Sequence, residues 1–132
     1  RLRAIHHLEK GYIVIFAGGT GQPYVTTDYT AAQRSLETRA EAILFAKNKA
    51  RGIFTADPRT DPTARMYERM HYNTILRNNL TIIDQTAIIL AREHGLPIHV
   101  FDFDGKGTSQ QICDGRDAGT LVSDVEPDVL ES

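Results

Sequence analysis

The chain has 132 residues, of which 41% are hydrophobic and 24% are charged, and its formal net charge is −2. This length and composition fit one globular domain. The basic residues form no long block, so we expect no nucleic-acid partner. No stretch approaches the roughly 20 apolar residues that span a bilayer, so we expect no membrane contact. The single cysteine, Cys113, cannot form a disulfide within the chain, and we expect a cytoplasmic protein.

The first residues, RLRAIHHLEK, lack the apolar core of a signal peptide. They are typical of the end of a helix that begins upstream, with Gly11 as its stop. Apolar, β-branched runs follow, of the kind found in strands that are buried on both faces of a parallel sheet. These predicted strands cover residues 12–17, 42–46, 96–103 and 119–122.

Helical patterns with capping residues alternate with these runs. Thr26 or Thr27 is expected to cap the first of them and Asp84 a later one, which Gly95 ends. The predicted helices cover residues 26–40, 71–80, 84–95 and 107–115.

Strands that alternate with helices predict an α/β fold, a three-layer sandwich whose mostly parallel sheet has helices on both faces. Between the second strand and the second helix, two Asp-Pro pairs mark residues 53–70 as an irregular excursion. The acidic segment 123–132 contains a proline, and we expect a flexible tail there.

The segment FAGGTGQPYVTTD, residues 16–28, links a predicted strand to a predicted helix. Its glycines let a ligand approach the backbone, and the N–H groups of the following helix favour an anion. It matches neither G-x-x-x-x-G-K-[ST] nor a clean G-x-G-x-x-G, so a plain turn and a phosphate loop both remain open. Asp28 either stabilises the helix end or organises charge during phosphoryl transfer.

Several motifs in one order resemble bacterial UMP kinases, within the amino acid kinase superfamily. They are HLEKGYIVIFAGGTGQPYVTTDYTAAQRSLE, AKNKARGIFTADPRTDPTARMYERMHYNTIL, DQTAIILAREHGLPIHVFDF and GTLV. The resemblance as a whole covers nearly the entire chain, from Arg3 to Val122. The resemblance implies an amino acid kinase-like fold and phosphorylation of UMP to UDP by ATP, a step of pyrimidine nucleotide biosynthesis.

The resemblance also implies roles for individual residues. Asp28 matches the acid taken to be catalytic, and ATP is expected to arrive with Mg²⁺ rather than to find a metal held by protein ligands. Positions expected to hold ATP, chiefly its adenosine end, are Asn48, Phe54 and Asp57. Positions expected to hold UMP are Gly19, Thr20, Gly21, Gln22, Pro23, Tyr24, Val25, Thr26 and Thr27.

Four positions depart from the family pattern. Gln22 replaces an asparagine, Val25 an aromatic residue and Phe54 a frequent tyrosine. Arg51 stands where the family has an aspartate, which places a cation beside the expected nucleotide site.

The family's K-x-S-G-E and G-G-G-N segments, which belong to its first half, do not occur in this sequence. Residues 1–122 are therefore expected to form the C-terminal, nucleotide-binding half of the fold and to be inactive alone, because phosphoryl transfer depends on charge stabilisation. We expect self-association, since family members are homohexamers. Two other interpretations stay open: a nucleotide-binding regulatory module without kinase activity, and a storage protein like the molybdenum-binding relatives.

Overall fold

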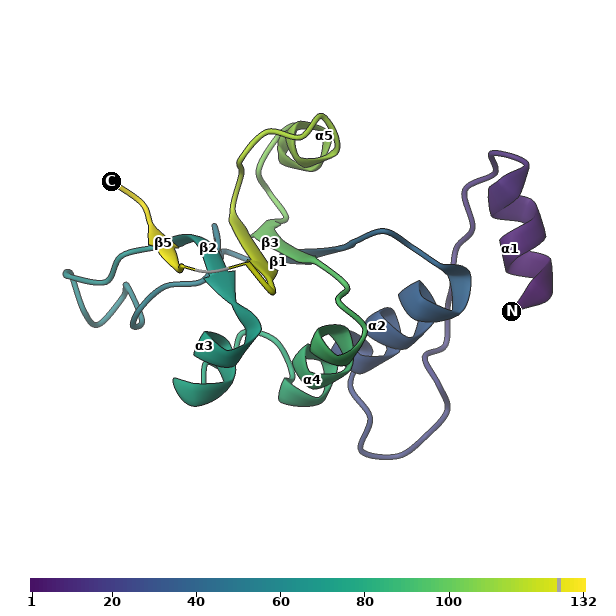
Figure 1. The fold of residues 1–132 in the computed structure, drawn as a ribbon, viewed down its shortest axis with the longest axis horizontal. Coiled ribbons are helices and arrows are strands. Elements are labelled where there is room, and N and C mark those ends of the chain that lie inside the picture. Colours follow the sequence, from purple (N-terminus) through teal and green to yellow (C-terminus); the bar gives the residue numbers. More distant parts are fainter. Residues whose placement is uncertain (126) are drawn as a thin grey trace.

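A computed structural model describes residues 1–125 and 127–132. Two helices, two strands and two further helices follow one another along the chain, before a strand, a helix and two last strands (Figure 1). The helices are α1 (Leu2–Glu9), α2 (Thr27–Thr38), α3 (Tyr72–Arg77), α4 (Gln85–Glu93) and α5 (Thr108–Cys113). The strands are β1 (Ile43–Lys47), β2 (Tyr67–His71), β3 (Ile98–Asp102), β4 (Thr120–Ser123) and β5 (Val129–Leu130).

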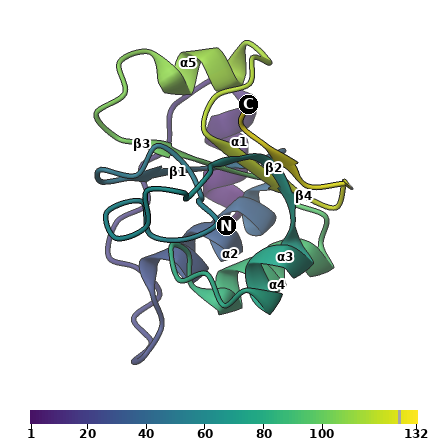
Figure 2. The ribbon, with the colours of Figure 1, turned by 90° about the vertical axis from the view of Figure 1, so that its left-hand side faces the viewer.

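The described strands form one sheet in the order β1-β3-β4-β2-β5. The pairs β1–β3 and β2–β4 are parallel, whereas β3–β4 and β2–β5 are antiparallel. Helices α2, α3 and α4 lie against one face of the sheet, and α5 lies over the other (Figures 1 and 2). The predicted α/β class is confirmed, and the sheet is mixed.

The two long core helices begin at the residues that the sequence marks as caps. The Thr26 hydroxyl accepts a hydrogen bond from the backbone N–H of Tyr29 at 3.2 Å. The Asp84 carboxylate accepts from the N–H of Thr86 at 2.8 Å and from its hydroxyl at 2.6 Å. These bonds stabilise the charged carboxylate and lower the pKa of Asp84.

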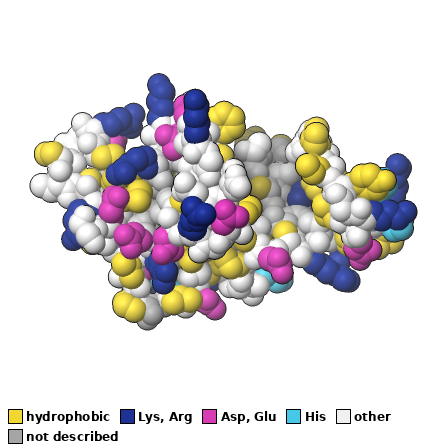
Figure 3. Space-filling model, turned by 90° about the horizontal axis from the view of Figure 1, so that it is seen from above, with side chains coloured by type: hydrophobic (Ala, Val, Ile, Leu, Met, Phe, Trp, Pro, Cys, Tyr) yellow, Lys and Arg dark blue, Asp and Glu magenta, His cyan; other side chains and the backbone are white. Residues whose placement is uncertain are grey.

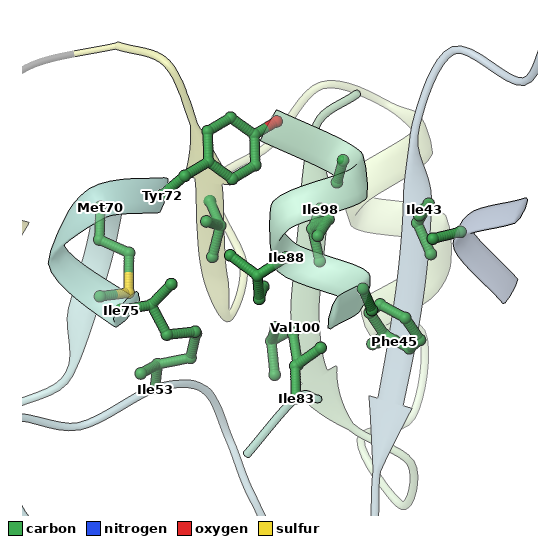
Figure 4. Close-up of a cluster of buried hydrophobic side chains, with 14 of the residues drawn as sticks. Ile43, Phe45, Ile53, Met70, Tyr72, Ile75, Ile83, Ile88, Ile98 and Val100 are labelled. Carbon is green, nitrogen blue, oxygen red and sulfur yellow. The ribbon is translucent and has the colours of Figure 1, made fainter. Parts of the chain in front are cut away.

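The core lies between the sheet and helices α3 and α4 (Figure 4). Ile88 of α4 packs over the β3 residues Ile98 and Val100, and none of the three is more than 1% exposed. Tyr72 is fully buried, yet its hydroxyl donates to the carbonyl of Leu96 at 2.6 Å. Burial raises the pKa of Tyr72 to about 12.

The strand predicted for residues 12–17 does not form. This segment carries no strand assignment, and its side chains are exposed: Ile13 is 93% and Ile15 88% accessible. Helix α1 stands apart at the same end of the molecule (Figure 1), where hydrophobic side chains reach the surface beside basic ones (Figure 3). An apolar run becomes a strand only where a neighbouring strand accepts its hydrogen bonds, and none of the described strands does so.

Two strands were missed. β2 lies in the predicted excursion and helix start, and β5 lies in the segment that we expected to be a flexible tail. β5 pairs with β2, and the Asp128 carboxylate accepts from the His71 N–H at 2.7 Å and from the Thr74 hydroxyl at 2.6 Å. These contacts tie residues 128–130 to the sheet.

His99 gives the fold a predicted pH dependence. It is half-buried on β3, and burial lowers the pKa of its imidazole from 6.5, opposed by the charge of Asp117. As the pH falls below 6.5, the unfolded chain takes up this proton before the folded one, so stability decreases until the pH passes the lower folded pKa. Urea unfolding at several pH values should show a shallower loss below this pH for His99→Gln, but not for His6→Gln in the exposed helix α1. Equal slopes for both variants would contradict this.

Candidate functional site

Asp28 and Lys47 form an ion pair between helix α2 and strand β1. The Lys47 Nζ lies 2.9 Å from both carboxylate oxygens of Asp28, and the two side chains are only 24% and 18% exposed. The backbone N–H of Asp84, at the start of α4, also donates to Asp28 at 3.1 Å. One carboxylate therefore joins β1, α2 and α4, and the ammonium group of Lys47 neutralises it.

A cavity of about 500 Å³ is lined in part by residues that are neighbours of this pair in the chain. Asn48, Phe54 and Asp57, the three residues predicted to hold ATP, all line it. Two of its lining residues are close in sequence to residues that form or contact the ion pair. Asn48 directly follows Lys47, and Ile82 lies two residues before Asp84. The other lining residues are Lys49, Ala50, Gly52, Ile53, Ala56, Pro58, Arg59, Leu80, Thr81 and Ile82.

Asp57 and Arg59 form an ion pair at this cavity. Arg59 donates to Asp57 at 2.9 Å through its guanidinium and at 2.9 Å through its backbone N–H. The guanidinium and this N–H hold the pKa of Asp57 below its usual value. Asp57 therefore stays a carboxylate at neutral pH, able to accept hydrogen bonds from hydroxyl groups of a ligand.

Only two of the residues predicted to hold UMP line a surface hollow. Gly19 and Thr27 line a space of about 480 Å³ against α2, together with Arg34 and other residues of that helix. Gly19 and Gly21 adopt positive φ angles of 65° and 72°, which glycine tolerates best. The other loop residues lie outside this hollow. Thr20 and Val25 are half-buried, and the exposed ones are Gly21, Gln22, Pro23, Tyr24 and Thr26.

Tyr24 is the most exposed of these residues. Its side chain is fully accessible, and its backbone has a φ of 63°, which is uncommon for a residue other than glycine. Such strain is often kept where a side chain serves a ligand or a partner. Thr26 has a structural part as the cap of α2.

Sequence reasoning missed Lys47. The residue lies inside the AKN motif and directly precedes Asn48, but no spacing in the sequence indicates that it meets Asp28. Arg51 was expected beside the nucleotide site. Its guanidinium carbon lies 5.8 Å from the centre of the Phe54 ring, so it is next to one wall of the cavity. It pairs with Glu131 at 3.5 Å and lines a neighbouring hollow, which Asn48 and Asp57 do not line.

Among residues 1–125 and 127–132, no helix has the length and apolar character needed to cross a bilayer. Over the same residues, no three His, Cys, Asp or Glu side chains are grouped as ligands of a metal ion. The site is thus built from an ion pair, an open cavity and a glycine loop.

Several known proteins have similar sequences. A uridylate kinase from Frankia casuarinae is 46% identical over 123 residues, which are 93% of this chain and 48% of the relative. One from Rubrobacter xylanophilus is 49% identical over 122 residues, or 92% of this chain and 48% of the relative. The chain therefore spans about half the length of the curated relatives it matches.

Solved structures show the same arrangement. The UMP kinase from Bacillus anthracis superposes with a TM-score of 0.96 at 49% identity, covering 99% of this chain and 53% of that one. The UMP kinase from Ureaplasma parvum gives 0.85 at 35% identity, covering 93% and 53%. These matches confirm the resemblance drawn from the motifs. The model of the amino acid kinase family matches residues 2–102, and the chain belongs to this family.

Proposed function

We propose that this chain carries the nucleotide-holding part of an enzyme that transfers the γ-phosphoryl group of ATP to UMP. The observation that supports this most strongly is the cavity, which brings Asn48, Phe54 and Asp57 together beside the Asp28–Lys47 pair. A flat aromatic face, an amide and a carboxylate suit an adenosine, since they supply stacking and hydrogen bonds. The names of the similar proteins point to the same reaction.

In this proposal, the adenosine end of ATP lies against Phe54 and its phosphates reach toward Lys47. An oxygen of the UMP phosphate attacks the γ-phosphorus, and the bond from that phosphorus to the β-phosphate oxygen breaks, which leaves ADP and UDP. Lys47, held in place by Asp28, offsets part of the charge on the phosphate oxygens. Mg²⁺ bound to ATP would neutralise further phosphate charge. It would need few protein ligands, because Mg²⁺ on a nucleotide is held largely by phosphates and water.

The ion pair also explains how an acid can lie beside a phosphate loop. An isolated carboxylate at the start of α2 would repel a phosphorylated ligand, but Lys47 neutralises Asp28 at 2.9 Å. The first two N–H groups of α2, those of Thr27 and Asp28, and the backbone of Gly19 are then proposed to bind the phosphate of UMP. The tip of the loop, with Gln22 and Tyr24 exposed, is assigned to the uridine.

The wider setting follows from the same proposal. We place the enzyme in the cytoplasm, in pyrimidine nucleotide biosynthesis, and infer that it works as a homohexamer. The exposed apolar side chains of residues 12–17 support association, because such surface is seldom left open to water. By itself, the 132-residue chain is proposed to turn over little, since it lacks the K-x-S-G-E and G-G-G-N segments that are expected to help neutralise the phosphates of ATP.

The reaction is tested by incubating the protein, as the cell makes it, with ATP, UMP and Mg²⁺ and by following UDP. We expect turnover within the usual kinase range of ~1–100 per second, and at least tenfold less for the 132-residue chain alone, since one lysine supplies only part of the charge stabilisation. CMP and AMP serve as control acceptors. Nucleotide binding without turnover in the natural protein would refute the kinase and favour the regulatory module.

A further inference from the structure

The wall of the nucleotide cavity is an arm that leaves the sheet and returns to it. Residues 52–66, called the arm here, run from the end of the β1 segment to the start of β2. The arm is closed on itself by a bridge between Phe54 and Met66 and by a backbone hydrogen bond from Thr55 to Arg65 at 2.9 Å. It carries Phe54 and Asp57, so the position of the arm sets the width of the cavity.

Thr120 fastens both ends of this arm. It belongs to the GTLV motif at the start of β4, and it is fully buried. Its hydroxyl accepts from the N–H of Ile53 at 2.8 Å and donates to the carbonyl of Tyr67 at 2.5 Å. A single hydroxyl, more than 50 residues away in sequence, thus satisfies one backbone group on each side of the arm.

Two glycines make this contact possible. A Cβ on Gly52 would lie 2.5 Å from the Thr120 hydroxyl oxygen and 2.8 Å from the sulfur of Met66. A Cβ on Gly119 would lie 2.1 Å from the carbonyl oxygen of Val100, on the neighbouring strand β3. The backbone at Gly119 therefore packs closely against β3, and the arm packs closely against the side chain of Thr120.

We propose that Thr120 is a positioning residue for the nucleotide cavity. It holds the arm so that Phe54 and Asp57 face Asn48, and it does so without touching the nucleotide. This inference rests on the proposed function for the identity of the ligand, an adenine nucleotide. The hydroxyl, rather than the volume of the side chain, carries the effect, because its two bonds go to the ends of the arm.

The test compares Thr120→Val, which keeps the shape and loses the hydroxyl, with Thr120→Ser, which keeps the hydroxyl. A fluorescent ATP analogue and UMP are titrated into each variant. Two unsatisfied backbone groups open the arm, so Thr120→Val should weaken binding of the ATP analogue about tenfold or more, with binding of UMP unchanged. Thr120→Ser should restore most of the affinity for the ATP analogue.

A matched control removes a different long-range threonine bond. Thr74→Val loses the hydrogen bond from the Thr74 hydroxyl to Asp128, at 2.6 Å, and leaves the arm alone. It should lower the free energy of unfolding without weakening the binding of the ATP analogue. Gly52→Ala displaces the arm and keeps Thr120. It should also weaken binding of the ATP analogue, and it replaces Thr120→Val in the test if that variant does not fold.

Hydrogen–deuterium exchange of the arm amides separates this inference from the proposed function. In Thr120→Val the amide of Ile53 and its neighbours to residue 57 should exchange faster, and in Thr120→Ser and Thr74→Val they should not. If the unchanged protein binds no adenine nucleotide, the proposed function fails and the exchange result alone decides the role of Thr120. Unchanged exchange and unchanged affinity in both Thr120→Val and Gly52→Ala would overturn the inference.

Discussion

Replacing Asp28 with asparagine is expected to lower the rate of phosphoryl transfer about 10²- to 10³-fold, the usual effect of removing one group that stabilises charge in a transition state. The amide oxygen of asparagine can still accept the hydrogen bond from the N–H of Asp84, so the local fold should persist. The lost charge can no longer hold Lys47 in place as phosphate charge shifts. Steady-state kinetics on the protein as the cell makes it should show the loss in kcat, with KM for ATP and UMP little changed.

The matched control is Asp114→Asn. Asp114 follows helix α5, its carboxylate forms an ion pair with Arg116 at 3.9 Å, and it lies outside both the cavity and the arm. Its replacement removes the same charge from the protein and should leave kcat within about twofold of the unchanged protein, because remote surface charges contribute little. An Asp28→Asn enzyme as fast as its parent, or an equal loss in both variants, would remove Asp28 from the reaction.

The largest loss of stability is expected for Gly119→Ala. The new methyl group would lie 2.1 Å from the Val100 carbonyl oxygen, in the middle of the sheet, so β3 and β4 must separate. Its backbone φ of +69° adds strain for any side chain. The two effects together should lower the free energy of unfolding by about 2 to 5 kcal/mol, a large part of the stability of an ordinary domain.

Gly115→Ala is the control for backbone strain alone. Gly115 has a φ of +76°, but no atom lies within 4 Å of the position of its Cβ. Its replacement should lower the free energy of unfolding by only about 1 to 2 kcal/mol, as measured by urea unfolding of both variants. Equal losses of the free energy of unfolding in the two variants would contradict this prediction. They would show that β4 packs less tightly against Val100 than the structure indicates.

Much of the fold follows from local signals in the sequence. Thr26 and Asp84 mark the starts of α2 and α4, because a side chain that accepts the first free N–H groups is a property of a few neighbouring residues. The apolar runs that became β1 and β3 needed no partner to be recognised. These elements were predicted because their cause lies within the element.

The errors concern elements whose cause lies elsewhere in the chain. β2 carries Glu68 and Arg69 among its apolar residues, and Arg69 is paired with Asp117, 48 residues away. β5 has two residues and exists through its pairing with β2. Residues 12–17 show the reverse case, an apolar run for which the described chain offers no pairing edge.

The candidate site divides in the same way. Resemblance to a family led to Asn48, Phe54 and Asp57, and the structure brings them to one cavity, although their roles stay predictions. Lys47 was not predicted, since its meeting with Asp28 depends on how β1 lies beside α2. Nor was Thr120, since a threonine in a strand is ordinary until the two backbone groups that it binds are seen.

The central claim is that an adenine nucleotide occupies the cavity between the arm and Asn48, with its phosphates toward Lys47. NMR titration of the protein with a non-hydrolysable ATP analogue tests it most directly. We predict that the largest shifts fall on Asn48, Phe54 and Asp57 and extend to the Lys47 side chain. Shifts confined to the neighbouring hollow of Thr108 and Gln111, or no saturable shifts at millimolar nucleotide, would contradict it.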